Sequence, residues 1–409
     1  YMGVSMKSLL VYLKNYKKES FFAPLFKMLE AIFELIVPLV VSSVIDNGIL
    51  RNDYRKVLYD VGIMVVLAVV GMSVSVTAQY FAAKAAAGFG RELRSDLFKK
   101  IQSLSFSELD SAGTSTLVTI MTNDTAQVQN GVNMVLRLFL RSPFIVFGAL
   151  VMAFTIDVQC ALIFLVTIPI LTVVIVAIMR YTMPRYRSIQ FHLDELTLKT
   201  RENLSGARVI RAFTREAEET ESFFEKNKAL SHLQKAVGRI SALMNPLTYV
   251  IINVAIIVLI YEGGVRVDAG DLSQGQVVAL YNYMSQILVE LIKLANLIVT
   301  VTRSFACASR IENVFKLQNS LQHSDNTVKA NDYAVCFDHV SLKYNGSSEE
   351  SLKDIDFRAN KGDIIGIIGG TGSGKTSMVS LIPHFYDATE GTVYVNGVDV
   401  KAQEDHLLR

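Results

Sequence analysis

Residues 57–80 read VLYDVGIMVVLAVVGMSVSVTAQY, an apolar run long enough to cross a bilayer core of roughly 30 Å as an α-helix. Five further runs of similar length occur in the first 300 residues. This number favours a bundle of membrane-spanning helices over the buried core helices of a soluble protein. The six predicted spans are Phe21–Val44, Val57–Tyr80, Leu138–Ile156, Cys160–Met179, Leu243–Tyr261 and Val277–Val301.

The composition agrees with a membrane protein and excludes several other classes. Of 409 residues, 51% are hydrophobic and 19% are charged, whereas an average soluble domain has about 25% charged residues. The net charge of +2 gives no general attraction to polyanions, so we expect no nucleic-acid partner. Cys160, Cys307 and Cys336 have neither a paired framework nor a metal-binding spacing, so we expect reduced, buried thiols.

The distribution of lysine and arginine predicts the orientation. If the N-terminus is cytoplasmic, the cytoplasmic segments carry four, five and twelve of these residues, and the opposite connections carry three, none and one. Cytoplasmic loops of multi-pass proteins are enriched in Lys and Arg. We therefore expect a multi-pass protein of the cytoplasmic (inner) membrane, with its N-terminus and its C-terminal domain in the cytoplasm.

Two connections between the spans are themselves predicted to be long helices. Residues 81–104 are rich in Ala, Leu, Lys and Arg, which are good helix formers, so the second span should continue to Leu104 as one helix. Residues 185–240 have a similar character. Helices of this length extend well below the membrane, and we expect them to hold a soluble domain at their tips.

The composition changes after the sixth span and predicts the domain boundaries. We expect a transmembrane domain with two long cytoplasmic helical extensions at 1–318, a polar linker at 319–334 and a soluble α/β domain, incomplete, at 335–409. The predicted strands of this last domain are Val335–Tyr344, Ile355–Arg358, Asp363–Ile368 and Thr392–Val395.

A phosphate-binding pattern lies in this last domain. Residues 369–376 read GGTGSGKT and fit G-x-x-x-x-G-K-[ST]. The apolar run DIIGII at 363–368 predicts a buried strand before the loop, and the residues after it predict a helix that ends near Tyr386. In this order, the backbone N–H groups of the loop can turn toward a phosphate. The predicted cofactor-binding residues of the loop are Gly369, Gly370, Thr371, Gly372, Ser373, Gly374, Lys375, Thr376 and, as a weaker candidate, Ser377.

Single side chains near the loop have expected roles. Lys375 should contact the β- and γ-phosphates of ATP, and the hydroxyl of Thr376 should bind Mg²⁺. Tyr344 ends the first strand and could stack on an adenine ring, although packing is the commoner role of such a tyrosine. We expect His384 to be a partly exposed histidine at the end of the helix that follows the loop. The predicted fold is therefore multi-domain: an all-α transmembrane bundle of six long helices, followed by an incomplete α/β P-loop nucleotide-binding domain.

Ionisable residues inside the predicted spans mark further candidate positions, because charges in a membrane are costly. Lys27, Glu30 and Glu34 share one face of the first span, and Glu290 and Lys293 are three residues apart in the sixth. Two interpretations remain open. These groups either line a wet cavity that favours cationic or amphipathic cargo, or they neutralise one another as ion pairs, which Glu290 and Lys293 favour.

The chain as a whole resembles the half-transporters of ATP-binding-cassette (ABC) exporters of the multidrug, lipid or peptide type. In these proteins a six-span membrane domain is fused to a nucleotide-binding domain. The resemblance rests on the order of the spans and on SELDSAGTSTLVTIMTNDT (107–125), ENLSGARVIRAFTRE (202–216), VSLKY (340–344) and GGTGSGKTS (369–377).

The resemblance implies roles for these segments. Tyr344 would be the adenine-stacking residue, and Gly369–Thr376 would be the Walker A loop. Segments near Phe106–Gly113 and Glu202–Arg208 would be coupling helices, one pressing on its own nucleotide-binding domain and one on the partner's. ATP would close two such domains, and the long helices would carry this closure to the membrane.

The sequence departs from the family pattern after Thr376. No Q-loop, signature motif, Walker B Asp with its catalytic Glu, or switch His follows. We therefore expect no catalytic residue within this chain, partial ATP binding, no hydrolysis by the chain alone and a native polypeptide that continues past Arg409. The similar LSQGQ at 272–276 precedes the phosphate loop instead of following it, and we interpret it as a helix start with Ser273 as the N-cap.

Arginines begin the third span. Arg137 and Arg141 lie on its cytoplasmic side. Long basic side chains near a helix end can reach the membrane surface, so we expect both to do so.

The expected function is ATP-driven export of small amphipathic compounds, lipids or peptides by alternating access. The expected partners are a second half-transporter, identical or different, membrane lipid and a small hydrophobic or amphipathic cargo; the expected cofactors are ATP and Mg²⁺. Two alternatives remain: a non-hydrolysing, ATP-sensing membrane protein that gates a pore or a partner, and an importer of the same architecture.

Overall fold

The computed structural model describes residues 9–321 and 332–409, and these form two compact units. The described residues of one unit are 9–15, 86–130, 303–321 and 332–409, and those of the other are 16–85 and 131–302. The long helices α3 (Tyr54–Gln102) and α12 (Gln274–Lys316) each contribute to both units. The predicted boundaries at 318 and 334 stay a prediction, and most of the predicted linker lies outside the described residues.

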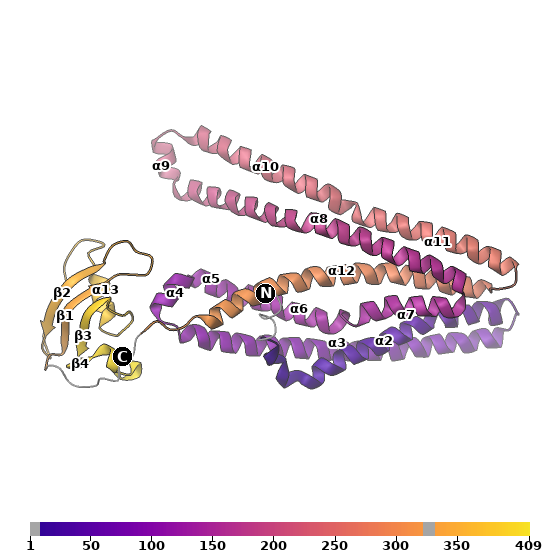
Figure 1. Ribbon diagram of the computed structural model, residues 1–409, viewed down its shortest axis with the longest axis horizontal. Coiled ribbons are helices and arrows are strands. Elements are labelled where there is room, and N and C mark those ends of the chain that lie inside the picture. Colours follow the sequence, from indigo (N-terminus) through magenta and orange to yellow (C-terminus); the bar gives the residue numbers. More distant parts are fainter. Residues whose placement is uncertain (1–8, 322–331) are drawn as a thin grey trace. The chain divides into compact units, whose positions relative to one another are not determined.

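Six helical segments in the described part of the chain are long and apolar enough to cross a membrane, as predicted. Their main helices are α2 (Lys17–Ser43), α3, α7 (Arg141–Ile156), α8 (Val158–Ser205), α11 (Met244–Asp268) and α12. Figure 1 shows the long helices α3, α8, α11 and α12 among them.

Two of these helices continue far beyond the length that a membrane requires. With 49 residues, α3 is about 73 Å long, and α8 has 48 residues. In Figure 1, α8 runs beside α10 (Glu216–Ala242), with the short α9 (Ala207–Ala212) between them. An ion pair of 2.6 Å joins Lys199 of α8 to Glu219 of α10. The predicted helical connections are therefore confirmed.

The membrane helices of the second unit pack through small side chains. Ala31 of α2, Ala149 of α7 and Ala279 of α12 are fully buried in its main apolar cluster. Small residues let helix backbones approach closely, which replaces the hydrophobic driving force that a lipid environment lacks. Helix α3 carries exposed valines, such as Val65 and Val69, as expected for side chains that contact lipid.

The start of α12 is held by an acidic residue from another helix. Ser273 accepts a hydrogen bond from the backbone N–H of Gln276 at 3.2 Å, and the Gln276 side chain accepts from the Ser273 N–H at 2.9 Å. Asp46, in the π-helical segment η2 (Val44–Ile49), accepts from the Ser273 hydroxyl at 2.5 Å and from the Gly275 N–H at 2.8 Å. The predicted N-cap is confirmed, and LSQGQ is a helix start.

Residues 332–409, in the unit that also contains residues 86–130, form a four-stranded sheet with short helices. Its strands are β1 (Val335–Leu342), β2 (Leu352–Ala359), β3 (Glu390–Val395) and β4 (Val398–Asp399), in the order β2-β1-β3-β4 with all neighbours antiparallel. Helix α13 (Lys375–Leu381) packs on it through Leu381 and Met378. The remaining elements are η1 (Leu10–Tyr16), α4 (Phe106–Ala112), α5 (Thr114–Thr119), η3 (Ile120–Asp124), α6 (Thr125–Leu138), η4 (Val400–Ala402) and α14 (Asp405–Leu408).

The predicted strand at 363–368 is wrong for this structure. The run has no regular secondary structure, and Ile364 and Ile368 are 98% and 96% exposed. A strand must pair with a neighbouring strand, and the described sheet, β2-β1-β3-β4, does not include this run. Its local pattern is that of a buried strand, but among the described residues no strand covers it.

The helix after the phosphate loop is shorter than predicted. It ends at Leu381 instead of near Tyr386, because Pro383 has no N–H with which to continue the helical hydrogen bonds. His384 follows with a φ of 54° and is fully buried, with its Nε2 3.0 Å from Asp387. The expectation of a partly exposed histidine is therefore wrong.

Candidate functional site

The backbone of the phosphate loop has a shape that only glycine adopts easily. Gly372 and Gly374 have φ angles of 87° and 82°, in the left-handed region. A Cβ at Gly374 would lie 2.6 Å from the Ser351 carbonyl oxygen, so the loop also approaches the start of β2 too closely for a side chain. The glycines are thus required by the path of the chain.

Lys375 lies over this loop. Its Nζ donates to the carbonyl oxygens of Gly369 at 2.9 Å and Gly370 at 2.6 Å, and to the Ser373 hydroxyl at 3.2 Å. Three oxygens of the loop therefore hold the ammonium group against it. This is where a cation can meet a phosphate that the loop amides bind.

The structure brings Tyr344 to the same place. Its hydroxyl donates to Ser377 at 3.0 Å, and its ring lies edge-on to Tyr386 at 5.1 Å between centroids. Thr376 is exposed in the first turn of α13. Tyr344, Lys375, Thr376 and Ser377 thus gather around one end of α13, although their roles toward a nucleotide stay predictions.

Helix α4 contacts the segment that follows α13, in the same unit. The rings of Phe106 and Phe385 are 4.5 Å apart, and the Tyr386 hydroxyl donates to Asp110 at 2.6 Å. Burial, and then the hydrogen bond to the Asp110 carboxylate, hold the pKa of Tyr386 well above its usual value, so the hydroxyl remains a donor. The predicted coupling segment near Phe106–Gly113 therefore contacts this chain's own C-terminal sheet domain.

Sequence reasoning missed Phe385 and Tyr386. Two adjacent aromatic residues shortly after a helix-ending proline, with only His384 between, were a usable signal, because such rings need a partner surface. The second predicted coupling segment, Glu202–Arg208, lies at the junction of α8 and α9, in the unit formed by residues 16–85 and 131–302. Its role stays a prediction.

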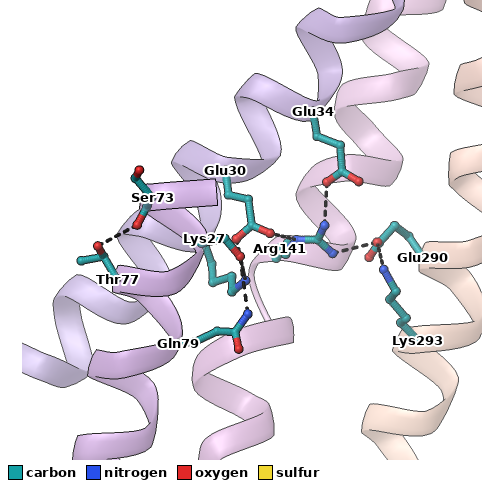
Figure 2. Close-up of polar contacts among 10 residues, drawn as sticks. Lys27, Glu30, Glu34, Ser73, Thr77, Gln79, Arg141, Glu290 and Lys293 are labelled. Atoms are coloured by element: carbon teal, nitrogen blue, oxygen red, sulfur yellow. Dashed lines mark hydrogen bonds and ion pairs between the residues drawn. The ribbon is translucent and has the colours of Figure 1, made fainter. Parts of the chain in front are cut away.

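A second polar centre lies among the membrane helices, and it corrects the prediction for Arg141. This side chain is only 8% exposed and does not reach a membrane surface. It donates from Nη2 to Glu34 at 2.6 Å and from Nη1 to Glu290 at 2.8 Å (Figure 2). Two carboxylates on α2 and α12 therefore stabilise a guanidinium group inside the bundle. Arg137, at the end of α6, is half-buried.

The other ionisable groups of the spans are paired as well. Lys293 donates to Glu290 at 2.8 Å, as the pairing interpretation predicted, and Lys27 donates to Glu30 at 2.5 Å. Glu290 also accepts from Ser142 at 2.7 Å. We call Lys27, Glu30, Glu34, Arg141, Glu290 and Lys293 the charge network; it joins α2, α7 and α12 and has three charges of each sign.

Three members of the charge network, Glu30, Glu34 and Arg141, also line a cavity; that this cavity favours cationic or amphipathic cargo stays a prediction. A pocket of about 400 Å³ lies between α2 and α3 and is lined by Glu30, Glu34, Arg141, Ser75 and apolar side chains. We call it the α2–α3 cavity. Ion pairing and exposure to an open space therefore occur in the same side chains.

Comparison with known families supports both parts of the chain. The profile of the ABC transporter transmembrane region matches residues 20–291, and that of the ABC transporter ATP-binding domain matches residues 352–409. The first match spans the membrane helices, and the second includes the phosphate loop and α13.

Individual relatives agree with the two profiles. The chain is 33% identical over 404 residues to an uncharacterised ABC transporter ATP-binding protein of Mycobacterium tuberculosis, which covers 97% of this chain and 69% of the relative. It is 30% identical to the ABC transporter ATP-binding protein YfiB of Bacillus subtilis, over 96% of this chain and 68% of the relative. It is 28% identical to the B. subtilis protein YgaD, named for multidrug export, over 100% of this chain and 72% of the relative. The chain therefore belongs to the ABC transporter family, as a multi-pass membrane protein that carries an ABC ATP-binding domain.

Proposed function

We propose that this chain is one half of a dimeric exporter that uses ATP and Mg²⁺ to move small amphipathic compounds, lipids or peptides out of the cytoplasm. The second half is a copy of this chain or a different half-transporter. Alternating access would expose the membrane helices first to the cytoplasm and then to the outside. The domain division at 318 and 334 belongs to this proposal.

One observation carries the proposal. Helix α4 lies in sequence between two membrane-spanning segments and contacts Phe385 and Tyr386, which lie shortly after the end of the helix of the phosphate loop. Tyr386 in turn packs against Tyr344, the candidate base-stacking residue. A change at the nucleotide site can therefore pass to α4 through direct contacts, which a transport ATPase requires.

Three further findings support export across the cytoplasmic membrane. YgaD, one of the relatives, is named for multidrug export. The Lys and Arg residues cluster in the segments that would be cytoplasmic, which supports a cytoplasmic N-terminus and ATP-binding domain. The Lys375 ammonium and the Thr376 hydroxyl fit a Mg²⁺-bound triphosphate, because the first matches phosphate oxygens and the second is a hard oxygen ligand.

The proposal is tested with the complete transporter in sealed vesicles, by measuring ATP hydrolysis and ATP-dependent uptake of amphipathic dyes. Lys375→Ala removes the cation that should neutralise charge on the transferred phosphate, so both rates should fall by at least about a hundredfold. Lys353→Ala, on the exposed face of β2, is the matched control and should leave both unchanged.

Each alternative predicts a different result. An ATP-sensing gate would show flux that ATP switches without being hydrolysed, and an importer would move its substrate in the opposite direction. Equal uptake by the wild type and Lys375→Ala would remove the pump proposal.

A further inference from the structure

The strongest unexplained feature is the α2–α3 cavity. Its polar side is formed by Glu30, Glu34 and Arg141, with Ser75 of α3. Its remaining lining is apolar and includes Phe33, Val37, Met64, Leu67 and Met72. A cavity with one charged side and apolar walls suits a small amphipathic molecule.

The two carboxylates of the cavity are incompletely used. Arg141 binds Glu34 through Oε2, and Lys27 binds Glu30 through Oε2. No hydrogen bond within the described part of the chain involves Oε1 of either residue. Glu34 is also the most accessible acid of the charge network, with a side chain 36% exposed. Oε1 of Glu34 therefore remains as an acceptor for a ligand that donates protons, and Oε1 of Glu30 has, among the described residues, only a 3.9 Å ion pair with Arg141.

Arg141 provides an independent second observation. Its Nε is buried, and no acceptor within the described residues forms a hydrogen bond with it. The nearest carboxylate oxygen, Oε1 of Glu30, is 3.9 Å away, which is too long for a direct hydrogen bond. A buried donor without an acceptor costs free energy, so this N–H calls for an oxygen between Arg141 and Glu30.

The charges around the cavity favour an amine in the same ligand, next to the oxygen that would accept from Arg141 Nε. The ammonium of Lys27 is turned to Glu30 and Ser75, and that of Lys293 to Glu290. The ammonium groups of the network are thus held by other partners. Glu30 Oε1 has the 3.9 Å ion pair with Arg141 but accepts no hydrogen bond from the described residues, and Oε1 of Glu34 is an acceptor only. Arg141 itself occupies the other oxygen of Glu34, as a resident counter-ion.

We propose that the α2–α3 cavity binds an amphipathic amine whose protonated nitrogen donates to Glu34 and whose neighbouring hydroxyl or carbonyl oxygen accepts from Arg141 Nε. The apolar part of the molecule lies along Val37, Met64 and Leu67. The site rests on the proposed export function only in that this molecule would be cargo; binding itself needs no ATP.

Three fluorescent naphthyl ethers test the site on the complete transporter without nucleotide. Propranolol carries the amine and the hydroxyl, its deoxy analogue carries the amine only, and its glycol analogue carries the hydroxyls only. The wild type should bind them in that order of affinity. Glu34→Gln, which keeps the size of the side chain and an oxygen acceptor for Arg141, should weaken both amines about tenfold and leave the glycol unchanged.

Two glycines of α3 supply a matched steric test. A Cβ added at Gly71, in the cavity, or at Gly62, elsewhere on α3, meets no neighbouring atom within 4 Å. Gly71→Leu should weaken all three probes by filling the cavity, and Gly62→Leu should weaken none. Glu262→Gln removes a carboxylate on α11, outside the cavity, and serves as the control that should weaken none of the probes.

The result that overturns this site is equal binding of the three probes by the wild type, Glu34→Gln and Gly71→Leu. Such a result leaves the Lys375→Ala comparison of ATP hydrolysis intact. Conversely, a failure of ATP-driven uptake leaves the binding measurements intact, so the two proposals fail separately.

Discussion

At the scale of single residues, Arg141 links two membrane helices, α2 and α12, through ion pairs. Its guanidinium group satisfies Glu290, which is 1% exposed, across a sequence distance of 149 residues. Removing one partner of a buried ion pair leaves an uncompensated charge, whereas replacing both by apolar groups can be nearly neutral.

We therefore predict that Arg141→Met destabilises the protein by about 3–5 kcal/mol. The double variant Arg141→Met with Glu290→Met should recover part of this loss, because no buried carboxylate is then left unpaired. Thermal unfolding in detergent measures both. A single variant as stable as the wild type would contradict the proposed importance of the pair.

At the scale of elements, the start of α12 depends on a carboxylate from another helix. Asp46→Ala removes the acceptor of the Gly275 N–H and of the Ser273 hydroxyl. We expect a loss of about 1 kcal/mol in stability, typical of a lost N-cap. The exposed Asp268 is the control, and Asp268→Ala should have no effect. Equal unfolding midpoints for the two variants would show that Asp46 does not cap α12.

The contact of α4 with Tyr386 makes a prediction about coupling. Tyr386→Phe keeps the ring against Phe106 and Tyr344 but removes the hydrogen bond to Asp110, which should weaken the contact by about 1 kcal/mol, or about fivefold. Transport per ATP hydrolysed should fall, while ATP affinity should stay close to that of the wild type. Tyr394→Phe in β3 serves as the control; a variant with unchanged coupling would exclude α4 as the route.

The same contact predicts a pH dependence. The pKa of Tyr386 is raised, so the folded state holds this proton more tightly than the unfolded state does. The contribution of the hydrogen bond is therefore complete below the usual tyrosine pKa of about 10 and is lost only as the pH rises through the higher value of the folded state. The coupling ratio should not decline between about pH 6 and about pH 9 because of this group. A decline near neutral pH that Tyr386→Phe abolishes would contradict this.

At the scale of the whole molecule, local patterns predicted what depends on local physics. Apolar runs identified the six spans, helix-forming residues identified the extension of α3, and the glycine pattern identified the phosphate loop. Arg141 was mispredicted because its partners are 107 and 149 residues away in sequence. The run 363–368 was mispredicted for the same reason, since a strand exists only with a neighbouring strand, which a local pattern does not reveal.

In the proposed transport cycle, nucleotide bound at the Lys375 loop changes which side of the membrane can reach the α2–α3 cavity. Ala68→Cys places a thiol in this cavity, and the native thiols Cys160, Cys307 and Cys336 are all buried, so their background reactivity is low. The most direct measurement is the labelling rate of this cysteine by a membrane-impermeant maleimide, added to either side of vesicles with and without ATP and Mg²⁺. The account predicts that ATP moves the reactivity from the cytoplasmic side to the opposite side, and that Lys375→Ala abolishes this change. Labelling from one side at the same rate with and without ATP would contradict it.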